Sequence, residues 1–118
     1  MRLRFSSSPR GVEVSGARAD FSAWAQELRR ERGLLPLDTG KGAIRCETVP
    51  GARMTIAWTA PARELLVRGG AEWMDILAEN VEGFAHDGEV GTPWHIEYFK
   101  GHAYLAPSCV PVACVLAD

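Results

Sequence analysis

Two segments of the chain, 53 positions apart, carry the same pattern of apolar and polar residues, and this repeat constrains the fold more than any other feature. Leu3 and Phe5 alternate with arginines, while Ile56 and Trp58 alternate with threonine and alanine. Alternation with a period of two is typical of a half-buried β-strand. Each segment turns into a second alternating run, so two β-hairpins are predicted. The matched pairs are Leu3 with Ile56, Phe5 with Trp58, Val12 with Leu65, Val14 with Val67, and Gly16 with Gly69.

An amphipathic helix is predicted after each hairpin. In the first helix Asp20 can cap the N-terminus and Gly33 suits the residue beyond the C-terminus. The second helix is expected over roughly residues 71–84, from the spacing of its apolar side chains. The chain is therefore interpreted as two strand–strand–helix units, at about residues 2–32 and 54–86. The expected buried helix residues are Phe21, Trp24, Ala25 and Leu28, followed by Trp73, Ile76, Leu77, Val81 and Phe84.

The remaining segments complete a single sheet in this interpretation. Strands are expected at residues 44–49 and 110–116, while residues 34–43, which contain Pro36 and two glycines, are expected to be a connector. Together these elements predict one α+β domain spanning residues 1–118. It would hold a mainly antiparallel sheet of about six or seven strands, with both amphipathic helices on one face.

Composition excludes several classes of protein. A chain of 118 residues, 47% hydrophobic and 24% charged, is long enough for a core and has the balance of an ordinary globular domain. No apolar run reaches the roughly 18 residues of a membrane span, and the first residues do not form a secretory signal. Three cysteines without CxxC spacing indicate reduced, mostly buried thiols and a cytoplasmic location.

Acidic residues are concentrated in the second half of the chain. Residues 1–53 carry ten Lys or Arg against six Asp or Glu, whereas residues 54–118 carry three against nine. On the second predicted helix four carboxylates recur at helical spacing and form one stripe, which could dock a basic protein or be an ordinary solvated face. Two more acidic residues follow in the next loop. The six residues are Glu72, Asp75, Glu79, Glu82, Asp87 and Glu89.

Residues 94–107, WHIEYFKGHAYLAP, hold the densest chemistry of the chain. If Lys100 and Gly101 form a hairpin turn, one face of the hairpin presents five side chains to a common surface. A glutamate beside a histidine could support general acid–base catalysis, although no nucleophile is placed next to them. A solvated polar strand face is the simpler interpretation. The five side chains are His95, Glu97, Phe99, His102 and Tyr104.

Other ligands find little support in the sequence. The two histidines of this stretch lack the helical HExxH spacing of zinc enzymes, and a Cys109–Cys114 pair would be a strained zinc site. No glycine-rich phosphate loop is present. The arginines of the first half are scattered and the isoelectric point is about 5.9, so nucleic-acid binding is not expected. No cofactor or metal is predicted.

The C-terminal third resembles the immunity protein 32 family, whose members are predicted to neutralise toxins that competing bacteria deliver to one another. The shared run is H-x-E-Y-F-x-G-H-x-Y-L-A-P, preceded by a helix that ends in an aromatic residue, while residues 17–52 match loosely. The run comprises His95, Glu97, Tyr98, Phe99, Gly101, His102, Tyr104, Leu105 and Pro107. The resemblance implies binding through an exposed surface, and no catalytic residue is carried over from it.

The sequence thus predicts a non-enzymatic immunity protein that occludes a basic toxin domain through the acidic stripe and the 95–104 surface. One alternative is a small hydrolase or metal-dependent enzyme that uses His95, Glu97 and His102. A second alternative is a homodimeric interaction module. Neither a nucleic acid nor a membrane is an expected partner.

Overall fold

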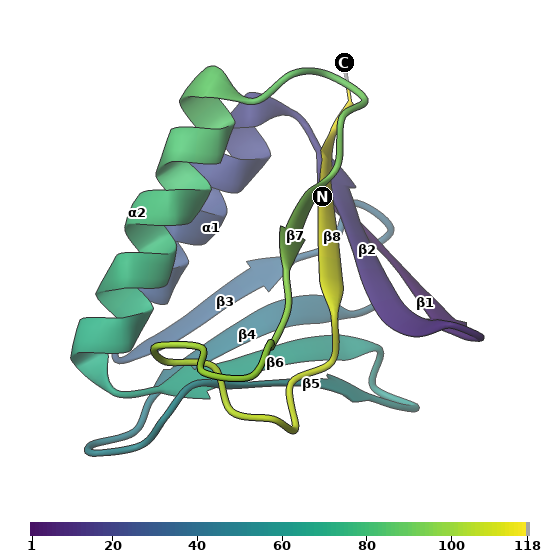
Figure 1. Ribbon diagram of the computed structural model, residues 1–118. Helices are drawn as coiled ribbons and strands as arrows, with labels where there is room; N and C mark the ends of the chain where they lie inside the picture. Colours follow the sequence, from purple (N-terminus) through teal and green to yellow (C-terminus); the bar gives the residue numbers. More distant parts are fainter. Residues whose placement is uncertain (118) are drawn as a thin grey trace.

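The computed structural model describes residues 1–117 and contains eight strands and two helices in that range. Figure 1 shows both sheets and the two helices that lie side by side against them. The elements are β1 (Arg2–Ser7), β2 (Arg10–Gly16), α1 (Arg18–Leu28), β3 (Arg32–Pro36), β4 (Ala43–Thr48), β5 (Thr55–Thr59), β6 (Glu64–Gly69), α2 (Ala71–Asp87), β7 (Trp94–Ile96) and β8 (Val112–Leu116).

The strands form two mixed sheets of four, with the orders β1-β2-β8-β7 and β3-β4-β6-β5. The α+β class and the two helices are confirmed, but the predicted single, mainly antiparallel sheet is wrong. Each sheet contains a central parallel pair, β2 with β8 and β4 with β6. These pairs join strands distant in the sequence. Local hairpin patterns carry no signal for such pairings, because they depend on how the chain returns after each helix.

Each half of the chain contributes two strands to each sheet. The order strand–strand–helix–strand–strand occurs once as β1 to β4 and again as β5 to β8. The β1–β2 hairpin pairs with β8 of the second half, where Val12 lies opposite Val112. The β5–β6 hairpin pairs with β4 of the first half, where Leu65 lies opposite Ile44. Neither half can therefore complete its own sheet, so the two halves are expected to fold together.

The predicted connector at residues 34–43 instead begins as a strand. β3 runs to Pro36 and pairs antiparallel with β4, so that Gly33 lies opposite Cys46. Proline is tolerated here because β3 is an edge strand with one unpaired side. Gly33, predicted to end the first helix, packs against α1, and a Cβ atom built on it would lie 2.2 Å from the carbonyl oxygen of Glu27. Glycine is required there by close packing of the backbone.

The helices close the core between the two sheets. Phe21, Trp24, Ala25 and Leu28 of α1 are all buried, as predicted. On α2 the buried stripe is shifted from the predicted one. Ile76 is 37% exposed, and Trp73 and Phe84 are only half-buried. The stripe consists of Met74, Leu77, Ala78, Val81 and Ala85.

The repeat-related aromatic residues Phe5 and Trp58 lie against each other. Their ring centroids are 5.5 Å apart and the ring planes differ by 6°. Phe5 belongs to β1 and Trp58 to β5, which are edge strands of different sheets. Stacked rings at this distance attract each other beyond the apolar area they bury. This contact therefore joins the free edges of the two sheets.

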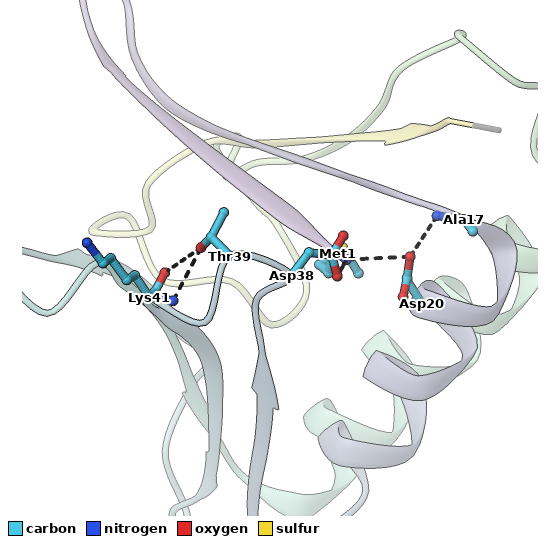
Figure 2. A network of polar contacts seen from close by, with 6 residues as sticks. All are labelled: Met1, Ala17, Asp20, Asp38, Thr39 and Lys41. Carbon is cyan, nitrogen blue, oxygen red and sulfur yellow. Dashed lines mark hydrogen bonds and ion pairs between the residues drawn. The ribbon is translucent and has the colours of Figure 1, made fainter.

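The first residue is held by carboxylates from two separate segments (Figure 2). The Met1 ammonium donates a 2.7 Å hydrogen bond to Asp38 Oδ1 and lies 3.5 Å from Asp20 Oδ2. Asp20 also accepts a 2.8 Å hydrogen bond from the Ala17 amide, which satisfies a free donor at the start of α1. This differs from the predicted cap, since Asp20 lies inside the first turn. The Met1 side chain is buried, so the network fixes the start of β1 against α1.

The cysteine thiols are free and buried, as the sequence indicates. Burial raises the pKa of Cys46 to about 12 and also raises the pKa of Cys114. Because the thiolate is the reactive form, both groups are inert at neutral pH. Among residues 1–117, no helix combines the length and the apolar content that a membrane crossing requires.

Two glycine substitutions should have opposite effects on stability. In Gly33→Ala the new methyl group meets the backbone of Glu27, so the free energy of unfolding should fall by about 2–3 kcal/mol. In Gly83→Ala the methyl group enters open space on α2, and the free energy should rise by about 0.5–1 kcal/mol. Urea denaturation of both variants measures these changes. A stable Gly33→Ala protein would contradict the close packing of α1 on β3.

The contact between Met1 and Asp38 predicts a pH-dependent contribution to stability. Its hydrogen bond and charge interaction with the ammonium hold the pKa of Asp38 below its usual value of 3.8. The stabilisation is therefore present above about pH 3.8 and is lost as the pH falls through the lowered pKa. Asp38→Asn should reduce the free energy of unfolding at pH 7, and the difference from wild type should vanish in strong acid. Glu31→Gln, which removes an exposed carboxylate outside this network, is the control.

Candidate functional site

A solvent-open hollow of about 520 Å³ lies between α2 and the segment that follows β7. Both elements come from the second half of the chain, and they are near each other in Figure 1. We call this hollow the aromatic groove, because aromatic rings from both sides line it. The lining residues are Leu77, Asn80, Phe84, Trp94, His95, Ile96, Glu97, Phe99, His102, Tyr104 and Leu105.

One wall comes from α2 and β7. Leu77, Asn80 and Phe84 follow each other at i, i+3 and i+7, which places them on one side of the helix. Trp94 of β7 stacks on Phe84 with ring centroids 5.3 Å apart and ring planes 29° apart. Both rings are only half-buried. A preformed aromatic surface therefore faces the groove.

The opposite wall is a loop and not the predicted hairpin. β7 ends at Ile96, and residues 99–102 form a tight turn in which the His102 amide donates to the Phe99 carbonyl at 2.9 Å. Gly101 has a φ of +89°, a conformation that favours glycine. The hairpin prediction is wrong because β7 finds its antiparallel partner in β8. The loop instead reaches across to Met54, whose amide donates to the Tyr104 carbonyl at 2.9 Å.

His102 organises this loop through its own ring. Its Nδ1 atom accepts hydrogen bonds from the amides of Tyr104, at 3.2 Å, and Leu105, at 3.1 Å. Burial, with a smaller contribution from the charge of Arg53, lowers the pKa of His102 below its usual 6.5. The ring is therefore neutral near pH 7, with its proton on Nε2. Its unprotonated nitrogen, Nδ1, already accepts hydrogen bonds from the loop.

Two further contacts fix the loop against the rest of the protein. Arg53 donates from Nη2 to the carbonyl oxygens of His102, at 2.7 Å, and Leu105, at 3.3 Å. Tyr104 stacks on Trp73 of α2 with centroids 6.0 Å apart, and its hydroxyl accepts from Asn80 Nδ2 at 3.4 Å. Phe99 and His102 continue the aromatic series, with centroids 4.7 Å apart. A row of rings therefore runs from α2 to the tip of the loop.

All five residues expected on the 95–104 surface line the groove, although they reach it from a strand and a loop. Within residues 1–117, no hydrogen bond links His95, Glu97 and His102 to one another, and no group of three His, Cys, Asp or Glu side chains is placed to hold a metal. The trio named for catalysis shares a hollow without forming a hydrogen-bonded relay.

The acidic stripe is divided by contacts with α1. Asp75 accepts from Arg29 Nε at 3.1 Å, and Glu82 accepts from Ser22 Oγ at 3.2 Å. These two carboxylates therefore have partners within the protein, because α1 packs beside α2, although the Asp75 side chain stays 61% exposed. Within residues 1–117, Glu72 and Glu79 are exposed and have no cation within 4.0 Å.

The two remaining predicted acids lie beyond the stripe. Asp87 is the last residue of α2 and is exposed. Glu89 accepts a 3.3 Å hydrogen bond from the hydroxyl of Thr92, which caps the loop locally. These residues extend the acidic surface toward the C-terminal end of the helix, away from its favourable positive end.

Sequence reasoning missed part of the site. Phe84 was expected in the core but is only half-buried and lines the groove, and Asn80 and Arg53 were not considered. The spacing of Asn80 between Leu77 and Phe84 could have indicated one helix side. No local pattern marks Arg53, because its role depends on carbonyl oxygens about fifty positions away.

Comparisons with protein-family models, with curated proteins and with solved structures gave no match for this chain. The resemblance of residues 95–107 to the immunity protein 32 family stays a prediction. The candidate site is therefore defined by its geometry alone.

The role of His102 predicts a change of loop structure in acid. Because its pKa is lowered on folding, the stabilisation from the neutral ring is present above about pH 6.5 and is lost as the pH falls toward the lowered value. Protonation of Nδ1 breaks its hydrogen bonds from Tyr104 and Leu105. An NMR titration should give a His102 pKa below 6.5, with the two amide signals moving together. A normal pKa would contradict this arrangement.

Proposed function

We propose that this chain is a cytoplasmic, non-enzymatic protein-binding domain, and specifically an immunity protein that neutralises a toxin by covering its surface. The observation that supports this best is the side chain of Phe99. It is 62% exposed at the tip of a fixed loop, on the rim of the aromatic groove. Large aromatic side chains beside a pocket are typical anchors of protein interfaces.

The loop is preorganised for this role. The amide groups of Tyr104 and Leu105 bind His102, and Arg53 binds two carbonyl oxygens of the same segment. A rigid loop loses little conformational entropy when a partner binds, so more of the contact energy contributes to affinity. The exposed ring of Phe99 then gains apolar burial only in a complex.

The exposed acidic residues of α2, together with Glu97 of the groove, favour a basic partner. Glu72, Glu79, Asp87 and Glu97 are exposed and, among the described residues, have no cation within 4.0 Å. Uncompensated charges on one surface speed association with a partner of opposite sign. Asp75 and Glu82 contribute less, because Arg29 and Ser22 already bind them. The resemblance described above adds the expectation that the partner is a toxin domain.

The hydrolase alternative has one supporting observation, which is that His95, Glu97 and His102 line one hollow. The hydrogen bonds to His102 Nδ1 weigh against it, since they occupy the nitrogen that would accept a proton. We therefore favour binding over catalysis.

The test uses the product of the gene adjacent to that of this chain, which the proposal expects to be a toxin. Phe99→Ala should weaken binding at least about tenfold, because it removes the central anchor. Glu79→Lys should slow association, most clearly at low salt, and leave dissociation largely unchanged. Surface plasmon resonance with purified proteins measures both rates, and survival of cells that co-express the pair measures neutralisation.

Two controls match these variants outside the groove. Leu34→Ala removes an exposed apolar side chain of β3, which is 43% exposed, and Glu31→Lys reverses an exposed charge. Both should bind as wild type does. If the controls impair binding as much as the groove variants do, or if the toxin does not bind at all, the proposal is wrong.

A further inference from the structure

We propose that the aromatic groove is a receptor for an arginine side chain presented by the basic partner. This inference rests on the proposed function and names the chemistry that the groove recognises. The guanidinium group would lie against the aromatic rings, within reach of the carboxylate of Glu97.

The aromatic composition of both walls suits a planar cation. Phe84 and Trp94 form a stacked pair on one wall. Phe99, His102 and Tyr104 form a continuous series on the other, with neighbouring centroids 4.7 Å apart. The faces of aromatic rings carry negative potential, and they attract arginine, which can also stack on them through its flat guanidinium group.

The groove carries a negative charge, which is the sign that attracts an arginine. Glu97 is the acidic residue of the lining, and the lining contains neither lysine nor arginine. Within residues 1–117, no cation lies within 4.0 Å of its carboxylate. The low pKa of His102 keeps that ring neutral near pH 7, so it does not repel a cation.

The nearby cations of the protein do not occupy the groove. Arg53 directs Nη2 at the carbonyl oxygens of His102 and Leu105, outside the groove lining. Lys100 is exposed at the turn and also lies outside the lining. Arg53 does act on His102, whose pKa its charge helps to lower, but its guanidinium is bound to backbone carbonyl oxygens and does not reach the Glu97 carboxylate. The exposed carboxylate of Glu97 is therefore left for a cation from another molecule.

The polar atoms of the groove favour arginine over a quaternary ammonium. Asn80 donates from Nδ2 to the Tyr104 hydroxyl, which leaves its carbonyl oxygen as an acceptor beside the rings. Glu97 supplies two further acceptor oxygens. Guanidinium carries five donors in a fixed plane and can use such acceptors while it stacks, whereas a quaternary ammonium donates none.

The experiment titrates the full chain with N-acetyl-arginine N-methylamide. The signals of ¹⁵N-labelled protein follow binding, in particular the Trp94 indole and the amides of residues 97–105. The matched probe is N-acetyl-citrulline N-methylamide, which has nearly the same shape without the charge. We expect saturable shifts confined to the groove with the arginine probe, and affinity at least about fivefold lower with the citrulline probe.

Variants of the protein provide the second comparison. Glu97→Gln keeps the shape of the side chain and removes its charge, so the arginine probe should bind about fivefold more weakly. Phe99→Ala should also weaken it. Glu31→Gln removes an exposed carboxylate outside the groove lining and should leave binding unchanged.

Each other result overturns the inference. Equal binding of both probes would show an uncharged apolar slot, and tighter binding of tetramethylammonium would show a site for quaternary ammonium groups. An absence of groove shifts, or equal weakening by Glu31→Gln, would also overturn it. These outcomes are independent of the toxin, so a toxin complex that depends on Phe99 would preserve the proposed function even if the arginine receptor failed.

Discussion

The parallel pairings of β2 with β8 and of β4 with β6 hold the two halves of this protein in one structure. Each pairing lies at the centre of its sheet, with one antiparallel pairing on either side of it. The helices can bury their apolar stripes only when both sheets are formed around them. The stacked rings of Phe5 and Trp58 add a contact at the edge where the two sheets approach each other.

The same pairings create the candidate site. Because β8 lies beside β2, its antiparallel partner β7 becomes a short edge strand of three residues, and the chain then leaves the sheet. The following loop crosses toward α2 and is fixed there by Arg53 and by the ring of His102. The groove is thus the space that remains between an edge strand and a helix of the same half. Its aromatic rings are positioned by this framework.

The acidic side chains of this surface fall into two groups. Some bind other side chains of the protein, and others have no nearby cation among the described residues. Packing of α1 beside α2 uses Asp75 and Glu82 in contacts with Arg29 and Ser22. Glu72, Glu79 and Glu97 are exposed and have no cation within 4.0 Å among the described residues; Glu97 lines the groove, and the other two lie on α2 outside its lining. Exposed ion pairs contribute little to stability, whereas free charges of one sign raise association rates with an oppositely charged partner. Steering and anchoring would then come from different residues of one surface.

Most of the local elements could be predicted from the sequence, apart from β3 and the loop after β7. Alternation at Leu3, Phe5, Ile56 and Trp58 marks two hairpins, and helical spacing marks two helices, because side-chain direction along a strand or helix follows from backbone geometry alone. The way in which the strands join became visible only in the folded protein. The division into two mixed sheets, the loop at residues 97–105 in place of a hairpin, and the pairing of Asp75 with Arg29 all depend on contacts between distant segments. Such contacts leave no periodic trace in the chain, since they are selected by the packing of complete elements and not by the preferences of neighbouring residues.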